Sequence, residues 1–195
     1  MPFSSPQVGT GSASLDFAVV EEDGTGSTGS RRVQCVDVLV LNPATYADTL
    51  AFGRFQTNDN RIVLKGLRAG LADIIVDVPG YFPAKFTDIT LNSGLNSLSD
   101  KVLMFKSTVA VALPGHLGLT LRESSRLPDI ADVYGPFGRV RVKAAPGGHY
   151  ELKIPFRGVK GTRRDVEALL GRLVRSPHVE TARPLVSLSA VIRSG

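Results

Sequence analysis

The sequence lacks several features that would assign a function directly. It has no tryptophan and one cysteine, Cys35, so it can form neither an intrachain disulfide nor a metal site built from cysteines. Cys35 lies in an apolar run, where cysteine behaves as a small hydrophobe. The three histidines, His116, His149 and His178, are far apart in the chain, and each is next to glycine or proline. We therefore expect exposed loop histidines rather than a catalytic or metal site.

Catalytic signatures are also missing. The chain has no Walker phosphate-binding loop, no His-Glu-x-x-His and no Gly-x-Ser-x-Gly nucleophile elbow. We expect no enzymatic activity and no cofactor. No stretch approaches the roughly 18 apolar residues of a membrane span, and the N-terminus lacks the basic and apolar regions of a secretory signal. The expectation is a soluble protein made in a cytoplasm, with no membrane partner.

Charge is distributed unequally along the chain. Residues 1–105 contain 8 Lys and Arg against 11 Asp and Glu, whereas residues 106–195 contain 15 against 7. The overall charge of +5 therefore combines an acidic half with a strongly basic half. This asymmetry predicts two modules with different electrostatic partners.

The acidic half has the pattern of an antiparallel β-sandwich. After an arm at residues 1–12, short apolar stretches recur through residues 13–105, separated by Gly-, Pro- and Asn-rich turns. Leu15, Phe17 and Val19 alternate with polar or small residues, which is typical of a strand with one buried face. The prediction is a Greek-key sandwich of about seven short strands.

Three motifs in this half resemble a known family. They are Gly-Arg-Phe within residues 52–55, Gly-Leu-x-x-Gly at residues 66–70, and Gly-Tyr-x-Pro at residues 80–83. Their order and spacing resemble the transthyretin-like, carboxypeptidase-regulatory-like β-sandwich over about residues 12–105. The resemblance implies a structural or adhesive domain, in which the glycines allow turns and Leu67 closes one end of the sandwich.

The basic half, residues 106–195, is predicted to be a smaller α+β module. Its clearest element is a hairpin over residues 139–157, closed by Pro-Gly-Gly. Alternation places one set of residues on a core face: Val140, Val142, Ala144, Tyr150, Leu152, Ile154 and Phe156. The other face is a candidate interaction surface that carries Arg139, Arg141, Lys143, Lys153 and Arg157. Residues 123–138 are expected to form a loop.

One amphipathic helix is predicted over residues 163–175, with Thr162 as its cap. Its apolar stripe is Val166, Leu169, Leu170, Leu173 and Val174. A final strand is predicted over residues 185–192. The complete expectation is mainly β: a sandwich followed by an α+β module with a single helix.

Three functions remain open at this stage. The leading hypothesis is a non-enzymatic structural subunit of a multi-protein assembly, most simply a head or tail accessory protein of a bacteriophage virion. In the virion it would be oligomeric and bound to other protein subunits. The first alternative is a free carbohydrate- or surface-binding module, for which Tyr46, Tyr81 and Phe82 are the candidate loop aromatics. The second is a nucleic-acid-contacting protein that uses the basic hairpin. A protein contact is preferred, because Tyr150 and Phe156 are expected on the core face and cannot stack on bases there.

Overall fold

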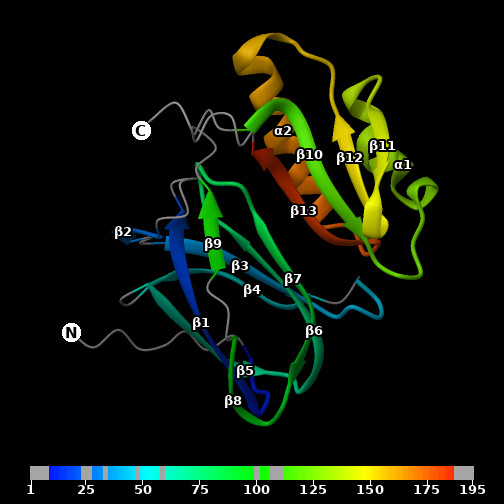
Figure 1. Ribbon diagram of the computed structural model, residues 1–195. Coiled ribbons are helices and arrows are strands. Elements are labelled where there is room, and N and C mark those ends of the chain that lie inside the picture. Colours follow the sequence, from blue (N-terminus) through cyan, green and yellow to red (C-terminus); the bar gives the residue numbers. More distant parts are fainter. Residues whose placement is uncertain are drawn as a thin grey trace. The chain divides into compact units, whose positions relative to one another are not determined.

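The computed structural model describes residues 9–22, 28–32, 35–46, 49–57, 60–98, 102–105 and 112–186 (Figure 1). The chain divides into two compact units, Met1–Phe105 and Lys106–Gly195. It is mainly β, with several antiparallel sheets and a small helical part, as the sequence predicted. Most of the predicted arm, residues 1–8, lies outside the described residues.

The first unit contains two sheets. One has the order β4-β3-β6-β7. The other has the order β2-β1-β5, and β8 and β9 also pair with β1. The strands are β1 (Ala13–Glu22), β2 (Thr28–Arg32), β3 (Cys35–Leu41), β4 (Thr49–Gln56), β5 (Arg61–Leu67), β6 (Gly70–Asp77), β7 (Ala84–Leu91), β8 (Gly94–Ser97) and β9 (Val102–Phe105).

The core of this unit follows directly from alternation along the strands. Leu15, Phe17 and Val19 of β1 are completely buried, as expected for one face of a strand. They share one apolar cluster with alternate residues of β3, β5 and β6, including Val38 and Ile74. The side chains of both sheets therefore form a single core, which is the arrangement of a sandwich.

Two connections in the first unit differ from simple hairpins. Strands β4 and β5 flank the polar turn around Asn60, yet they belong to different sheets, so this turn carries the chain across the sandwich. Strands β8 and β9 pair with β1 in parallel. Parallel pairing needs a long connection, and no local turn signal reveals it in a sequence.

The glycine motifs occupy positions that require glycine. Gly66 has φ +78° and Gly80 has φ +86°, in the region where side chains are strained. A Cβ on Gly66 would also lie 1.9 Å from the carbonyl oxygen of Gly9. Leu67 is buried in the core cluster. These features agree with the roles expected from the motifs, and membership of the transthyretin-like family stays a prediction.

The second unit has one sheet with the order β11-β12-β10-β13. Its elements are β10 (Ala112–Leu121), η1 (Leu127–Ile130), α1 (Ala131–Tyr134), η2 (Gly135–Phe137), β11 (Arg141–Ala145), η3 (Pro146–Gly148), β12 (His149–Lys153), α2 (Gly158–Val174) and β13 (Val179–Val186). All neighbouring strands are antiparallel. Two β-helix-β crossovers thus interleave, which is the ferredoxin-like, split βαβ arrangement.

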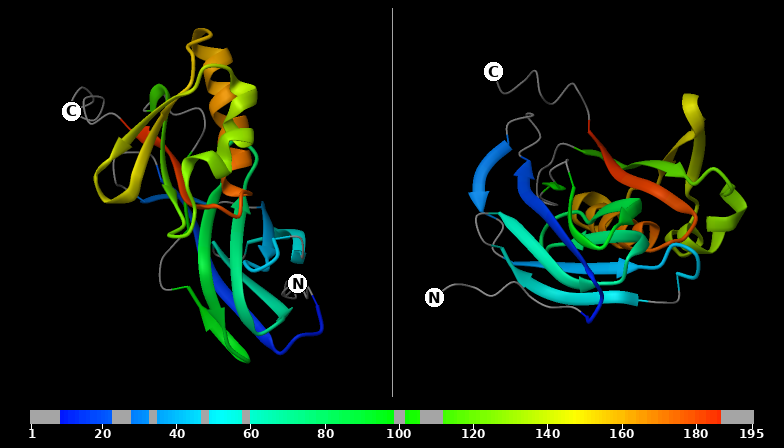
Figure 2. Two further views of the ribbon diagram at one scale, coloured as in Figure 1. Left: turned by 90° about the vertical axis from the view of Figure 1, so that its right-hand side faces the viewer. Right: turned by 90° about the horizontal axis from the view of Figure 1, so that it is seen from below.

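One face of this sheet is covered by helices. The apolar stripe of α2, which includes Val166, Leu169 and Leu173, is buried, and α2 contacts β10 and β13. The short helical turns of residues 127–137 lie beside α2, where Phe137 is buried and the Arg172 guanidinium lies 5.5 Å from its ring centre. Figure 2 shows these helical segments together on one side of the sheet.

Several expectations for the second unit were wrong in detail. Helix α2 begins at Gly158 rather than residue 163, and Thr162 is inside it, where its hydroxyl oxygen accepts a hydrogen bond from the Arg157 backbone N–H at 2.9 Å. The expected loop 123–138 contains η1, α1 and η2. Pro128 and Pro136 are the second residues of η1 and η2, within a first helical turn, where proline is tolerated.

The strand boundaries also change. A single strand, β10, runs through Pro114-Gly115, although this dipeptide is a turn signal, and it accommodates the dipeptide by a register shift. The last described strand, Val179–Val186, begins earlier than the predicted start at residue 185, because Val179 and Thr181 already pair with β10. Residues 187–192 of the predicted strand lie outside the described residues.

Candidate functional site

The strand register places Arg141, Lys143 and Lys153 on the sheet face opposite α2. Arg141 pairs with Lys153, which pairs in turn with His116, so these three side chains stand in a row across β11, β12 and β10. The next row along contains Lys143, Glu151 and Gly118. The apolar rows between them, such as Val142, Leu152 and Leu117, point to the helix side.

We call this surface the cationic face and define it by Arg139, Arg141, Lys143, Lys153 and Arg183, all of which are exposed. Arg183 belongs to it because it pairs with Gly118 on β13. Glu151 is the one acidic strand residue on this face within the described part of the chain, and its Oε1 lies 2.5 Å from Nδ1 of His116. The positive charges are therefore mostly unbalanced.

Sequence reasoning missed His116 and Arg183 as members of this face. Each is next to residues that suggest a loop or an unrelated strand, and only the pairing of β10 with β12 and β13 places them beside the hairpin. No local periodicity carries that information, since register between distant strands is set by tertiary packing.

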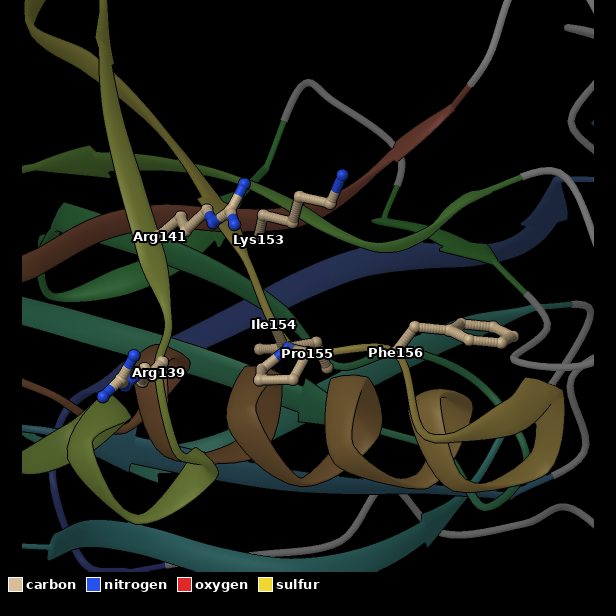
Figure 3. Close-up of a pocket in the computed structure, with 6 residues that line it drawn as sticks. All are labelled: Arg139, Arg141, Lys153, Ile154, Pro155 and Phe156. Atoms are coloured by element: carbon tan, nitrogen blue, oxygen red, sulfur yellow. The ribbon is translucent and has the colours of Figure 1, made fainter.

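Three of the cations share a pocket of about 360 Å³. It is lined by Arg139, Arg141, Lys153, Ile154, Pro155 and Phe156 (Figure 3). In Figure 3 the Arg141 and Lys153 side chains extend from neighbouring strands, and Phe156 follows Ile154 and Pro155 along the chain. The volume falls within the range of about 300–1,000 Å³ that is typical of small-ligand sites.

Arg157 is not part of this pocket, although the sequence grouped it with the other four cations. Its Nε lies 3.7 Å from Oδ2 of Asp165 on α2, and its backbone N–H is bound to Thr162. Its charge is therefore partly compensated by the helix. Lys143 is exposed on the face but does not line the pocket.

Phe156 corrects the prediction that it points into the core. Its side chain is 66% exposed. Strand β12 ends at Lys153, and Pro155 has no N–H with which to extend a ladder, so the alternation that buries Leu152 and Ile154 does not reach residue 156. Ala144, which was also predicted on the core face, is exposed near the tip of the hairpin. The pocket consequently combines three cations with an accessible aromatic ring.

The three histidines contact different partners. Nδ1 of His149 lies 2.7 Å from the Thr120 hydroxyl, and Nδ1 of His178 lies 3.1 Å from the Ser125 hydroxyl. None of the three histidines lines the cationic pocket. Among the described residues, no group of three or more His, Cys, Asp or Glu side chains could hold a metal ion.

The three aromatic residues proposed for carbohydrate binding do not form an exposed cluster. The Tyr46 hydroxyl donates to Oδ2 of Asp73 at 2.8 Å, and the Tyr81 hydroxyl donates to Oε2 of Glu21 at 2.7 Å. Phe82 is buried. These three residues therefore make contacts within the protein. They do not provide the exposed aromatic cluster that would favour a sugar-binding site at these loops.

Comparisons with known proteins assign no family. No family model matches the chain, and no curated protein matches it. Among solved structures, it is similar to a protein described as a "putative carbohydrate binding protein" from Bacteroides uniformis, with 14% identity and a TM-score of 0.34. The match covers 69% of this chain and 48% of that one, so the chain spans about half the length of the neighbour. A TM-score this low does not establish a shared fold.

No helix in the described part of the chain combines the length and apolar character required to cross a membrane.

Proposed function

We propose that this protein is a non-enzymatic binding subunit that attaches to an anionic partner through the cationic face of its second unit. The observation that carries the proposal is the direct opposition of Arg141 and Lys153 on the uncovered side of the sheet. Helices cover the other side, so this face is available to a partner without any rearrangement of the core.

The opposed cations do not help the fold. Like charges directly opposite each other on neighbouring strands are destabilising. Within the described residues neither Arg141 nor Lys153 forms an ion pair that would relieve the repulsion. Where a local rule is broken without compensation inside the protein, binding is the usual reason. An anionic group placed between the two side chains would supply the missing compensation.

Contact is required for this effect. At physiological ionic strength the field of an exposed charge extends over only about 8 Å, so the face acts on what it touches. Complementary charge then contributes mainly to the speed and specificity of association. This suits a subunit that attaches repeatedly to similar neighbours.

The test compares two double charge reversals with the same change in net charge. Arg141→Glu with Lys153→Glu alters the cationic face, whereas Lys65→Glu with Arg68→Glu alters exposed cations of the first unit. On immobilised heparin and on immobilised polyglutamate, we expect the first variant to elute at much lower salt than the parent. The control should elute close to the parent. Equal shifts for both variants would show that net charge alone drives retention, and would refute the proposal.

We keep the hypothesis that the protein is a subunit of a multi-protein assembly. The assembly we propose is a bacteriophage virion, in which the protein is a head or tail accessory protein and its neighbours are other subunits. Its support is the sequence resemblance of the first unit to an adhesive type of sandwich. The measurement is the fate of the protein when native particles are sedimented. Retention in the particle agrees with a subunit, and complete release into the supernatant contradicts it.

A further inference from the structure

We infer that the anionic partner of the cationic face is a single-stranded nucleic acid, whose phosphates contact Arg141 and Lys153 while an unpaired base stacks on Phe156. This inference rests on the proposed function, because it names the partner of the same face. It reverses the preference for protein that the sequence alone suggested, since that preference depended on a buried Phe156.

The backbone that carries Phe156 is anchored on both sides. On its N-terminal side, the Ile154 N–H donates to the Gly115 carbonyl oxygen at 2.9 Å, and the Ile154 side chain is buried. On its C-terminal side, the Arg157 N–H donates to Thr162 inside α2 at 2.9 Å. Pro155 restricts the backbone between these anchors. Phe156 is therefore presented on a short segment whose backbone is anchored at both ends, so little backbone freedom is lost when a ligand binds.

The surroundings of the ring favour a nucleic acid over an acidic protein. The centre of a protein–protein interface is depleted in charged residues, and an aromatic anchor there is enclosed by other apolar groups. Here an exposed Phe shares its pocket with Arg139, Arg141 and Lys153. Surfaces that bind single-stranded nucleic acids share two features. Cations lie along the path of the phosphate backbone, and an aromatic ring stacks on a base.

A single strand fits better than a duplex. A ring can stack only on a base whose face is accessible, which in a regular duplex is covered by its neighbours. The cationic face spans neighbouring strands of an open sheet, from Arg141 on β11 to Arg183 on β13. It can therefore accommodate several successive phosphates while one base enters the pocket beside Phe156.

The experiment measures fluorescence anisotropy of labelled oligothymidylate and oligouridylate of about 12 nucleotides, within the site sizes of known single-strand binders. Phe156→Ala should weaken binding by about 5- to 150-fold, the range reported for the loss of one stacked base. Phe156→Trp should bind at least as tightly as the parent. The matched control is Phe52→Ala, which removes an even more exposed ring, 72% accessible, from β4 of the first unit. It should leave affinity unchanged.

The salt dependence tests the cations separately. Each phosphate neutralised on a single strand contributes about −0.7 to the slope of log affinity against log salt. Arg141→Ala and Lys153→Ala should each make the slope shallower by about that amount. Phe156→Ala should leave the slope unchanged, because stacking releases no counterions.

The outcomes separate this inference from the proposed function. Absence of binding to both oligonucleotides, with heparin or polyglutamate retention still dependent on Arg141 and Lys153, would overturn the nucleic-acid assignment and leave the anionic-partner proposal standing, with an acidic protein as the partner. Duplex binding as tight as single-strand binding, and insensitive to Phe156→Ala, would also overturn it. If reversal of Arg141 and Lys153 changes no binding of any kind, both proposals fail.

Discussion

The opposition of Arg141 and Lys153 leads to a prediction about stability that is independent of any ligand. Lys153→Glu converts a repulsive cross-strand pair into an attractive one. Lys143→Glu, the same chemical change one row further along, does the opposite, because Lys143 stands opposite Glu151. We expect the first variant to be more stable than the parent and the second to be less stable.

The magnitude follows from Coulomb's law. Directly opposed side chains have Cβ atoms about 5 Å apart, and their flexible charged ends lie about 6–8 Å apart, so two unit charges in a water-like medium interact by about 0.5–0.7 kcal/mol. Screening at physiological salt reduces this by about half. Changing the sign of one charge changes the pair energy by twice the screened interaction, so each variant should shift the free energy of unfolding by about 0.5–0.7 kcal/mol. The two variants should then differ by about 1–1.4 kcal/mol.

The assay is urea unfolding followed by circular dichroism, with transition midpoints compared because extrapolated free energies are less certain. The measurement is repeated at about 1 M salt, where the screening length falls to about 3 Å and the difference should nearly disappear. If Lys153→Glu and Lys143→Glu shift the midpoint in the same direction, or if the difference persists at high salt, the register-based account of the face is wrong. In the expected case, Lys153→Glu stabilises the protein while it weakens binding to heparin.

Two further predictions concern the interior of the second unit and an ion pair of the first. Leu169→Ala should lower the free energy of unfolding by about 2–5 kcal/mol, because Leu169 is completely buried under the sheet. The control Arg164→Ala, on the exposed side of α2, should change the unfolding midpoint little. Equal unfolding midpoints for the two variants would mean that the apolar stripe of α2 is not packed. Hydrogen bonds from Arg54 lower the pKa of Asp37 from its ordinary value. The stabilisation is therefore present above the unfolded pKa of about 4 and is lost as pH falls through the lowered native pKa. Asp37→Asn should remove no more than about 1 kcal/mol at neutral pH and flatten the acid limb of the stability profile; an unchanged limb would contradict this.

The sequence predicted the structure correctly where burial of one face makes apolar residues recur at regular spacing along a continuous segment. The alternation of Leu15, Phe17 and Val19 predicted a strand of the sandwich, and the spacing of Leu169 and Leu173 predicted an amphipathic helix. In both cases the pattern is local, so the residues themselves reveal which face is buried.

It failed where the outcome depends on distant partners. Phe156 continues the alternation of β12 in the sequence, but the strand ends before it at Lys153, ahead of Pro155, and Ile154 bonds to Gly115 of the distant β10. The position of β10 between β12 and β13, which brings His116 and Arg183 to the cationic face, is likewise a matter of tertiary pairing. The site was therefore predicted in its charge but not in its aromatic component.

The strand order of the second unit also determines when its sheet can form. β10 comes first in the chain but lies in the interior of the sheet, and both of its partners, β12 and β13, are synthesised later. During translation, β10 must wait for β12 to cover one of its edges, and its other edge stays open to incorrect pairing until β13 has left the ribosome. Contacts between residues so far apart in sequence form slowly. Pro114 and Gly115, near the start of β10, interrupt its regular ladder and make that waiting strand a poorer template for aggregation.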